Sequence, residues 1–414
     1  MKWPPKSSTN CNPIVRPDWP RPGEHPAAAV NPGGDAIDIR YRITGYEGLI
    51  QSNHSLWQAP LPSLTRGTRG AQSPAITHAD YFRAVRSYLT GTGRPHIQQA
   101  LAASLPQMEA PFDPERIEVI LEKHGEFYHP ARILIVVGEA VIPLVLNVAV
   151  TPVGGECMAS EMAALGRVAP RLPSGSVPTV YGYALVSGAD DVALPMFLAD
   201  WFDGFHEFHL SMDPQSGRQG MVVWDTDTAS FYLSEQQQAE VYRQVAFLLT
   251  CAYDPDTTEQ IYPWHHASGD FVLRVRGASV DLRLITVRQY APTLTGDGEA
   301  LDDDARLMAL LVFFLNLTLR NRLDRLDGTG ETAYADPRAV AATVRGFLEA
   351  LQDELAVAFR GLLGAYGRAE LVDILTPVAD RYRLMPMEQD LIHANLAPHG
   401  AHLFEVLQSV LHEH

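Results

Sequence analysis

The feature that most constrains the fold of this chain is a change in residue pattern at Arg116. Three short runs rich in β-branched residues follow it, RIEVILEKHG, ARILIVVGE and VIPLVLNVAV, and turn-forming residues separate them. These runs predict three successive antiparallel strands. The next segment, GECMASEMAALGRVAP, repeats Met158, Met162 and Leu165 at helical spacing and ends at Pro170, so we expect a helix laid against the sheet.

The second half of the chain is patterned mostly as helix. Two further strand candidates, VPTVYGYALV and ALPMFLADWF, precede a long helix that begins at Ser234, where Gln237 completes a capping box. After Asp302 come the helix-patterned segments RLMALLVFFLNLTLRNRLDRL, PRAVAATVRGFLEALQDEL, AELVDILTPVADRYRL and GAHLFEVLQSVLHEH. The fold class expected from this order is α+β with two lobes, a small antiparallel sheet lobe and a mainly helical lobe with an embedded β-hairpin.

Three regions are expected along the chain. Ten of the thirty prolines fall within the first 62 residues, so residues 1–110 are predicted to form a proline-rich N-terminal arm with one short helix, ADYFRAVRSYL. Residues 111–205 are predicted to form the antiparallel sheet lobe with one helix. Residues 206–414 are predicted to form the helical lobe, with the hairpin at 270–287.

The charge of the chain limits its partners. The formal net charge is −17, and a surface of this sign is a poor partner for phosphate backbones, so nucleic acid is not expected as a partner. The lysines are Lys2, Lys6 and Lys123 only, so a mechanism that demands a lysine after position 123 is excluded. A small-molecule substrate or a protein partner remains.

Cysteine usage and hydropathy favour a cytoplasmic protein. Cys11, Cys157 and Cys251 lie far apart and form no C-x-x-C pair, which argues against a disulfide framework or a cysteine-rich zinc site. The first residues, MKWPPKSSTNCNP, lack the apolar region of a signal peptide. The longest apolar run, Leu307–Leu319, is too short to cross a bilayer core of about 30 Å, so we expect a buried helix and no membrane contact.

The segment IYPWHHASGDFVLRVRGASVDLRLITVRQY reads as one hairpin. A two-residue turn at 277–278, with glycine first, pairs Arg274 with Asp281 and places Asp270 opposite Ile285. The two aspartates then share a face but lie four residues apart along the ladder, about 13 Å at roughly 3.3 Å per residue. This separation exceeds the reach of one shared ion.

Two interpretations of Asp281 follow. One is a cross-strand ion pair with Arg274, a common stabilising device in sheets. The other is a metal ligand that works together with Asp270, which requires the backbone to turn away from the ladder at Gly269, a conformation that glycine permits.

The element order over about 116–375 resembles the protein-kinase-like fold, in particular the aminoglycoside phosphotransferase branch. His266-Ala-Ser-Gly-Asp270 resembles its catalytic loop, and the triplet centred on Asp281 resembles its strand-borne metal-binding triplet. The resemblance implies that His266 and Asp270 are catalytic, with Asp270 orienting the acceptor hydroxyl, and that Asp281 holds magnesium. Glu161, in the helix after the third strand, matches the helix glutamate of the family. ATP and Mg²⁺ are the cofactors implied.

The chain departs from the family at three points. Asn147 stands where a phosphate-gripping lysine is expected, Val275 stands where the catalytic-loop asparagine is expected, and the first hairpin lacks a G-x-G-x-x-G pattern. A nucleotide site would thus involve Glu161 and Asn147. Its positive charge would come from Lys123, Arg132 or Arg288, and Arg288 is the residue we assign to cofactor binding.

The adjacent histidines His265 and His266 invite a metal interpretation. Neighbouring residues on an extended segment point to opposite sides, so at most one of them could join Asp270 in a metal site. The alternative is a histidine packed beside Trp264 and bonded to a backbone carbonyl.

A second histidine pair, in DWFDGFHEFHLS, inverts the zincin spacing H-E-x-x-H. His206 and His209 therefore give a weak zinc signal, and the segment is expected to be a solvated, acidic linker between the lobes.

Three functions are compatible with these residues. The first is a divergent phosphotransferase acting on a small molecule, or a nucleotide-binding pseudo-enzyme of the same fold. The second is a non-catalytic scaffold that uses its cleft and the proline-rich arm for interaction. The third is a metal-dependent enzyme that uses His265 or His266 with Asp270.

Overall fold

The computed structural model describes nine stretches of the chain, residues 37–62, 76–125, 127–187, 193–225, 229–266, 269–294, 301–328, 330–381 and 386–412. These residues form two compact units. The sheet unit holds the described residues between 37 and 163 together with 178–203, and the helical unit holds 164–177 and the described residues from 204 onward.

The sheet unit is built on one six-stranded sheet in the order β1-β2-β3-β4-β6-β5. Its strands are β1 (Asp38–Ile43), β2 (Arg116–Leu121), β3 (Ala131–Val137), β4 (Ala140–Val148), β5 (Val180–Ser187) and β6 (Ala193–Asp200). β1 runs parallel to β2, and every other neighbouring pair is antiparallel. The three strands predicted after Arg116 are confirmed, as are the two predicted strands that became β5 and β6.

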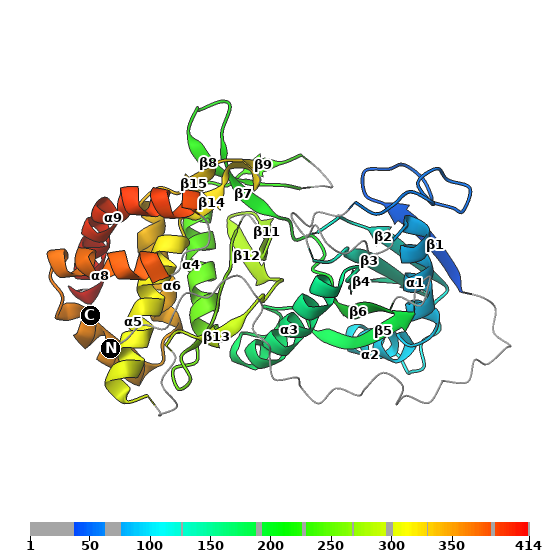
Figure 1. Ribbon diagram of the computed structural model, residues 1–414, viewed down its shortest axis with the longest axis horizontal. Coiled ribbons are helices and arrows are strands. Elements are labelled where there is room, and N and C mark those ends of the chain that lie inside the picture. Colours follow the sequence, from blue (N-terminus) through cyan, green and yellow to red (C-terminus); the bar gives the residue numbers. More distant parts are fainter. Residues whose placement is uncertain are drawn as a thin grey trace. The chain divides into compact units, whose positions relative to one another are not determined.

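Helices cover both faces of this sheet (Figure 1). α1 (His78–Thr90) and α2 (Arg94–Ser104) contribute Phe82, Tyr88 and Leu101 to the larger core, which the alternate residues of β2, β3 and β4 complete. α3 (Pro152–Val168) packs Met158 against Phe197 on the opposite face. The strict alternation of buried and half-buried residues along β2 and β3 follows from this sandwich.

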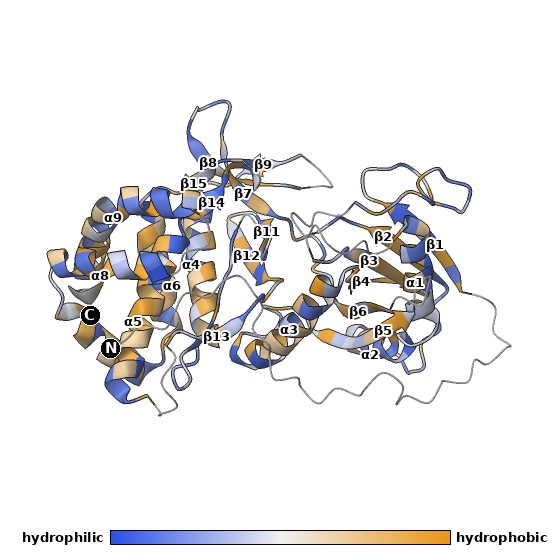
Figure 2. Ribbon diagram, in the orientation of Figure 1, coloured by the Kyte–Doolittle hydropathy of each residue, from blue (hydrophilic) through white to orange (hydrophobic). Residues whose placement is uncertain are grey.

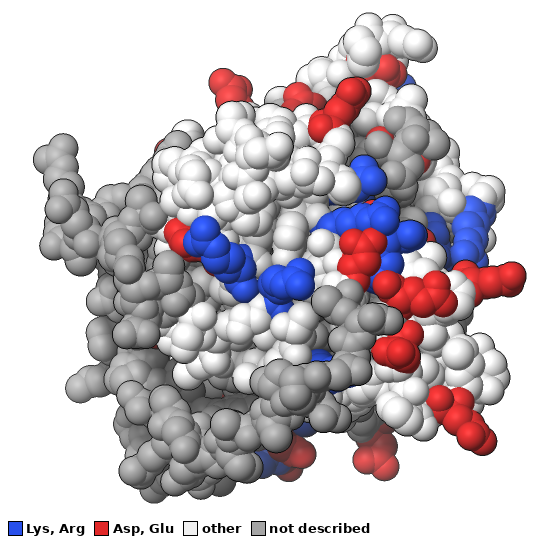
Figure 3. Space-filling model, turned by 90° about the vertical axis from the view of Figure 1, so that its right-hand side faces the viewer, with Lys and Arg blue, Asp and Glu red and all other residues white. Residues whose placement is uncertain are grey.

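Strand β1 is an outer strand of the sheet, and charged residues occupy it. Arg40 pairs with Asp38 at 2.8 Å, and Arg42 pairs with Glu118 of β2 at 3.5 Å. Basic and acidic side chains also lie beside one another on the face drawn in Figure 3. Charges on an edge strand disfavour the addition of a further strand, so this edge is protected.

The helical unit contains α4 (Glu235–Ala252), α5 (Asp303–Arg320), α6 (Arg338–Ala350), α7 (Asp353–Gly364), α8 (Arg368–Arg381) and α9 (Pro386–His412). Ser234 caps α4 in the predicted capping box with Gln237, and Asp302 caps α5 by accepting the N–H of Ala305. From Ala309 onward α5 is buried on all sides, as predicted, and Figure 2 shows it mostly in the hydrophobic colours. No described helix combines the length and the apolar content that a bilayer crossing requires.

Short strands complete the helical unit. They are β7 (Phe208–Met212), β8 (Gln219–Val223), β9 (Phe231–Tyr232), β10 (Glu259–Ile261), β11 (Phe271–Arg276), β12 (Ser279–Leu284), β13 (Tyr290–Pro292), β14 (Leu323–Arg325) and β15 (Thr332–Tyr334). β11 and β12 form the predicted hairpin, with Gly277 at φ +62° in its turn and Arg274 opposite Asp281. The predicted α+β class, with a sheet-rich unit and a helical unit that contains a hairpin, is confirmed.

The structure differs from the sequence-based boundaries at two places. Residues 1–110 were expected to form an arm, but β1, α1 and α2 belong to the sheet unit because their apolar residues complete its core; residues 1–36 and 63–75 lie outside the described residues. The segment 393–399 precedes the last helix predicted from the sequence, GAHLFEVLQSVLHEH. It lies inside α9, because Ile392, Leu396 and His399 are buried and their packing outweighs Pro398.

Candidate functional site

Asp270 lies directly before β11, and its carboxylate is fully engaged. One oxygen accepts the backbone N–H of His265 at 2.8 Å, and the other accepts an N–H of Arg288 at 3.0 Å. The residue is 1% exposed. Its backbone carbonyl accepts the N–H of Ile285 at 2.8 Å, which is the predicted position in the ladder. The guanidinium of Arg288 and the N–H of His265 therefore each engage one oxygen of Asp270.

The backbone turns at Gly269, as the metal interpretation requires, but this turn does not move Asp270 out of the ladder. Gly269 has φ +64°, and a Cβ there would lie 2.9 Å from the Oε1 atom of Glu207, so glycine is required. Asp270 nevertheless stays in the ladder through its carbonyl. The two aspartates remain four residues apart, about 13 Å at roughly 3.3 Å per residue, and the structure does not bring Asp270 and Asp281 to a common ion.

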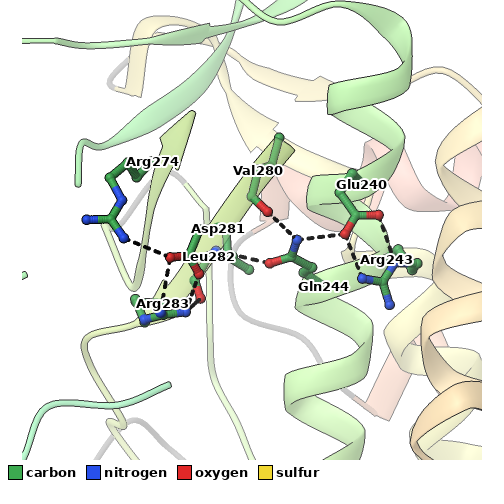
Figure 4. A network of polar contacts seen from close by, with 8 residues as sticks. All are labelled: Glu240, Arg243, Gln244, Arg274, Val280, Asp281, Leu282 and Arg283. Carbon is green, nitrogen blue, oxygen red and sulfur yellow. Dashed lines mark hydrogen bonds and ion pairs between the residues drawn. The ribbon is translucent and has the colours of Figure 1, made fainter. Parts of the chain in front are cut away.

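Asp281 is held by two arginines, as Figure 4 shows. Its Oδ2 atom accepts from Arg274 across the strand pair and from Arg283 on its own strand, each at 3.1 Å, and Arg283 also binds Oδ1. Both guanidinium groups lie over the ring of Phe205, at 4.4 and 5.2 Å from its centroid. The predicted ion pair between Arg274 and Asp281 is confirmed.

Helix α4 fixes the position of this hairpin. The side-chain amide of Gln244 donates to the carbonyl of Val280 at 2.7 Å and accepts the N–H of Leu282 at 3.0 Å, so it pairs with the outer edge of β12 as a neighbouring strand would (Figure 4). Glu240 on the same helix binds Gln244 at 2.7 Å and orients its amide. Asp281 is thereby presented from a rigid support.

His266 is a buried structural histidine. Its Nε2 atom lies 3.1 Å from Oδ1 and 3.3 Å from the backbone carbonyl of Asn321, at the end of α5, and its ring lies edge-on to Trp264. Burial lowers the pKa of His266, so the neutral ring is favoured. Nε2 faces two acceptors and therefore carries the proton, while buried Nδ1 has no hydrogen-bond partner. The alternative of a packed, carbonyl-bonded histidine is confirmed.

His265 points away from His266 and joins a separate buried network. Its Nε2 atom lies 3.1 Å from Glu388, which also lies 3.5 Å from Arg320. Burial opposes the charge on Glu388, but His265 and Arg320 together hold its pKa below the usual range. The two histidines do not converge with Asp270, and no group of three or more potential metal ligands occurs among the residues that the structure describes. The metal-enzyme hypothesis is therefore not supported.

In the sheet unit, Glu161 is buried on α3 and accepts the hydroxyl proton of Tyr128 at 2.6 Å. Asn147 is half-buried on β4, on the face that α3 covers, opposite Phe197. The Glu161 carboxylate therefore has a hydrogen-bond partner within the sheet unit itself.

The candidate replacements for the missing lysine have other partners. Arg288 binds Asp270, and Arg132 binds Glu122 at 2.7 Å while its guanidinium lies over Trp201. Lys123 is exposed in the connection after β2.

A cluster that sequence reasoning missed surrounds His209. This residue is 1% exposed, on β7, and its ring nitrogens lie 3.9 Å from Glu207 and 3.8 Å from Asp324, with Trp224 packed on the ring at 4.5 Å. Burial alone would lower the pKa of His209, but the two carboxylates outweigh burial and raise it to about 9. The expected solvated linker is wrong here, because β7 pairs with β8 and packs against a carboxylate 115 positions away.

The same cluster holds an unusual turn in place. Asp324 accepts the N–H of Leu210 at 2.7 Å, and Gly328, in the turn after β14, would place a Cβ 3.0 Å from His209. Asp327 and Gly328 both have positive φ, at 52° and 72°. The doublet of histidines in HEFH, with Glu207 between them, was the signal for this site, but its second acidic partner, Asp324, could not be read from spacing.

Comparison with known proteins gives a likeness of architecture only. No family model matches the chain, and no curated protein matches it. Among solved structures, the PAN3 pseudokinase of Drosophila melanogaster is similar at 11% identity and a TM-score of 0.27, over 74% of this chain and 66% of that one. The MAP kinase LmaMPK10 of Leishmania major is similar at 10% identity and a TM-score of 0.26, over 78% of this chain and 88% of that one. The chain thus spans slightly less than two thirds of the first of these proteins.

Proposed function

We propose that this chain is a catalytically degenerate protein of kinase-like, two-lobed build, which acts by binding a small molecule or a protein rather than by transferring a phosphoryl group. Of the two branches of the phosphotransferase hypothesis, the pseudo-enzyme is the one that the geometry favours. The observation that carries this proposal is the state of Asp281, whose carboxylate is bound by Arg274 and Arg283.

The donor set does not fit magnesium. Mg²⁺ requires oxygen ligands at about 2.0–2.1 Å in octahedral geometry. At Asp281 the ion would have to displace two guanidinium groups, and like charges at contact distance repel strongly at low dielectric. Asp270 offers no substitute, because Arg288 and the N–H of His265 engage its two oxygens. No step through a metal ion is therefore part of this proposal.

The residues of the sheet unit that the resemblance assigns to a nucleotide support the same conclusion. The buried carboxylate of Glu161 already receives a hydrogen bond from Tyr128, and Asn147 supplies no positive charge. In this proposal, any nucleotide binds without magnesium and without a positively charged side chain on its phosphates.

Thermal-shift titrations test the proposal. A ligand that binds only the folded state raises its melting temperature, by an amount that grows with concentration over Kd. We expect no magnesium-dependent shift with ATP or GTP in the wild-type chain. The double variant Arg274→Gln, Arg283→Gln releases Asp281, and we expect it to acquire a weak shift with Mg²⁺ alone.

The control is the same double variant with Asp281→Asn added, which should lose that shift. A magnesium-dependent nucleotide shift in the wild-type chain that disappears in Asp281→Asn would overturn the proposal. So would phosphoryl transfer to any acceptor that depends on Asp270.

A further inference from the structure

The connection between β2 and β3, described over residues 122–125 and 127–130, is tied to the sheet unit at its end. The backbone N–H of His129 donates to the carbonyl of Val148 on β4 at 2.9 Å, and its carbonyl accepts the hydroxyl of Tyr81 on α1 at 2.8 Å. His129 is 3% exposed. We call residues 122–125 and 127–130 the clasp.

A bond between two imidazoles holds the clasp closed. The Nδ1 atoms of His124 and His129 lie 3.0 Å apart. In such a pair one Nδ1 donates its proton and the other accepts it, so one ring must be neutral with its lone pair on Nδ1. When both rings are imidazolium, both nitrogens are donors and the bond cannot form.

A third imidazole stands next to this pair. His78, at the start of α1, donates from Nδ1 to the carbonyl of Ala59 at 2.9 Å, and its ring lies edge-on to His124, with 6.0 Å between centroids. Burial lowers the pKa of His129 to about 4, with contributions from the two other histidines, and burial also lowers the pKa of His124. Protons are thus disfavoured on His124 and His129.

The charged groups around the cluster do not compensate an added proton. The Glu122 carboxylate is bound by Arg132 at 2.7 Å and by the hydroxyl of Thr44 at 2.7 Å. Glu161 on α3 receives the hydroxyl of Tyr128. The remaining charged residue of the clasp whose environment is described, Lys123, is itself a cation.

The clasp lies against the face of the sheet that α3 also covers. The ring of Tyr128 lies edge-on to Phe197 at 6.3 Å between centroids, and its hydroxyl binds Glu161 at 2.6 Å. The main chain approaches so closely that a Cβ on Gly154 of α3 would lie 2.3 Å from the carbonyl oxygen of Phe127. Only glycine fits at this contact, so the residue at position 154 of α3 suits the closed position of the clasp.

We propose that the clasp is an acid-released cover over the α3 face of the sheet unit. Protonation of His124 and His129 removes their bond and places two cations at the same point. The clasp then leaves its seat, Tyr128 parts from Glu161, and a buried carboxylate beside the ring of Phe197 becomes accessible. This device does not depend on whether the chain transfers phosphate.

Hydrogen exchange on the full chain tests the device. With a pKa of about 4 for His129 in the closed clasp and about 6.5 in the open one, the opening equilibrium should rise about 30-fold between pH 8 and pH 5. We expect peptides that cover 122–130 to exchange about 30-fold faster at pH 5, after correction for the intrinsic rate. Peptides of β3 should keep their protection, since the opening is local.

Two variants separate titration from simple loosening. His129→Asn places an amide where Nδ1 lies, keeps a partner for His124 and cannot be protonated, so its clasp should lose most of the pH response. His124→Asn should lose part of it and serves as the second test where His129→Asn does not fold. His54→Asn, at another half-buried histidine of the sheet unit, is the matched control and should respond as the wild type does.

The proposal is overturned if exchange of the clasp in the wild type is the same at both pH values. It is also overturned if both clasp variants respond to acid as strongly as the control.

Discussion

The pair formed by Asp270 and Arg288 gives the sharpest test of whether this site is structural or catalytic. Arg288→Met removes the guanidinium but keeps much of the side-chain volume. The carboxylate of Asp270 is then left buried, with the backbone N–H of His265 still donating to it. Removing one partner of a fully buried ion pair costs about 3–5 kcal/mol.

The loss in free energy of unfolding expected here is smaller because the ion pair is only half buried. The side chain of Arg288 is 32% exposed, whereas that of Asp270 is 1% exposed, so water screens one end of the pair. We expect Arg288→Met to destabilise the helical unit by about 2–3 kcal/mol, which corresponds to about 5–10 °C in Tm for a unit of this size. Asp270→Asn keeps an acceptor for His265 and leaves a cation that water can reach, so we expect a loss of about 1 kcal/mol.

The assay is a double-mutant cycle by urea denaturation, with hydrogen exchange of peptides in 269–294 to assign the transition to the helical unit. Arg288→Met combined with Asp270→Asn should be no less stable than Arg288→Met alone, which corresponds to a coupling energy of at least about 1 kcal/mol. Catalytic residues are commonly held at a cost to stability. If Asp270→Asn instead stabilises the chain, or if the coupling energy is below about 0.5 kcal/mol, the structural reasoning is refuted and the proposed function loses its second support.

Three further predictions address other parts of the structure. The pKa of His209 is about 9 in the folded chain against about 6.5 when unfolded, so its contribution to stability is complete below about pH 6.5 and is lost as pH rises through 9. That contribution is up to about 3 kcal/mol. Urea denaturation at pH 6 and pH 9.5 should show that the difference in free energy of unfolding between wild type and His209→Gln is smaller at the higher pH. An equal difference at the two pH values would contradict the prediction. Tyr128→Phe leaves the carboxylate of Glu161 without its hydroxyl donor and should cost about 1–3 kcal/mol in urea denaturation of the sheet unit, whereas Tyr46→Phe, at an exposed site, should cost nothing measurable. Ser234→Ala removes the cap of α4 and should lower the free energy of unfolding by about 1 kcal/mol; a change below about 0.3 kcal/mol would mean that the capping box contributes little.

Local chemistry was sufficient to predict the hairpin in detail. Glycine at the first turn position and the alternation of residues on either side define one register, and β11 and β12 adopt it. The ion pair of Arg274 with Asp281 follows from that register alone. The second arginine on Asp281 was not foreseen, because Arg283 reaches it along its own strand, where side chains two residues apart share a face.

Long-range partners could not be predicted. The sequence suggested Arg288 as a source of positive charge, but not that it would neutralise Asp270. The resemblance placed Glu161 beside a nucleotide. In the structure, Glu161 instead accepts the hydroxyl proton of Tyr128, which lies in a connection 33 residues earlier. Such pairs depend on how distant segments pack, and no local period encodes that packing.

The amino-acid sequence by itself determined the α+β class, the antiparallel strands after Arg116, the capped helices and the hairpin register, since each depends on preferences that act over a few neighbouring residues. Tertiary structure alone decided which charged groups of distant segments meet. Burial of Asp270, His209 and Glu161 makes a partner necessary for each of them, and the partner is whichever group the packed chain brings within a few ångströms.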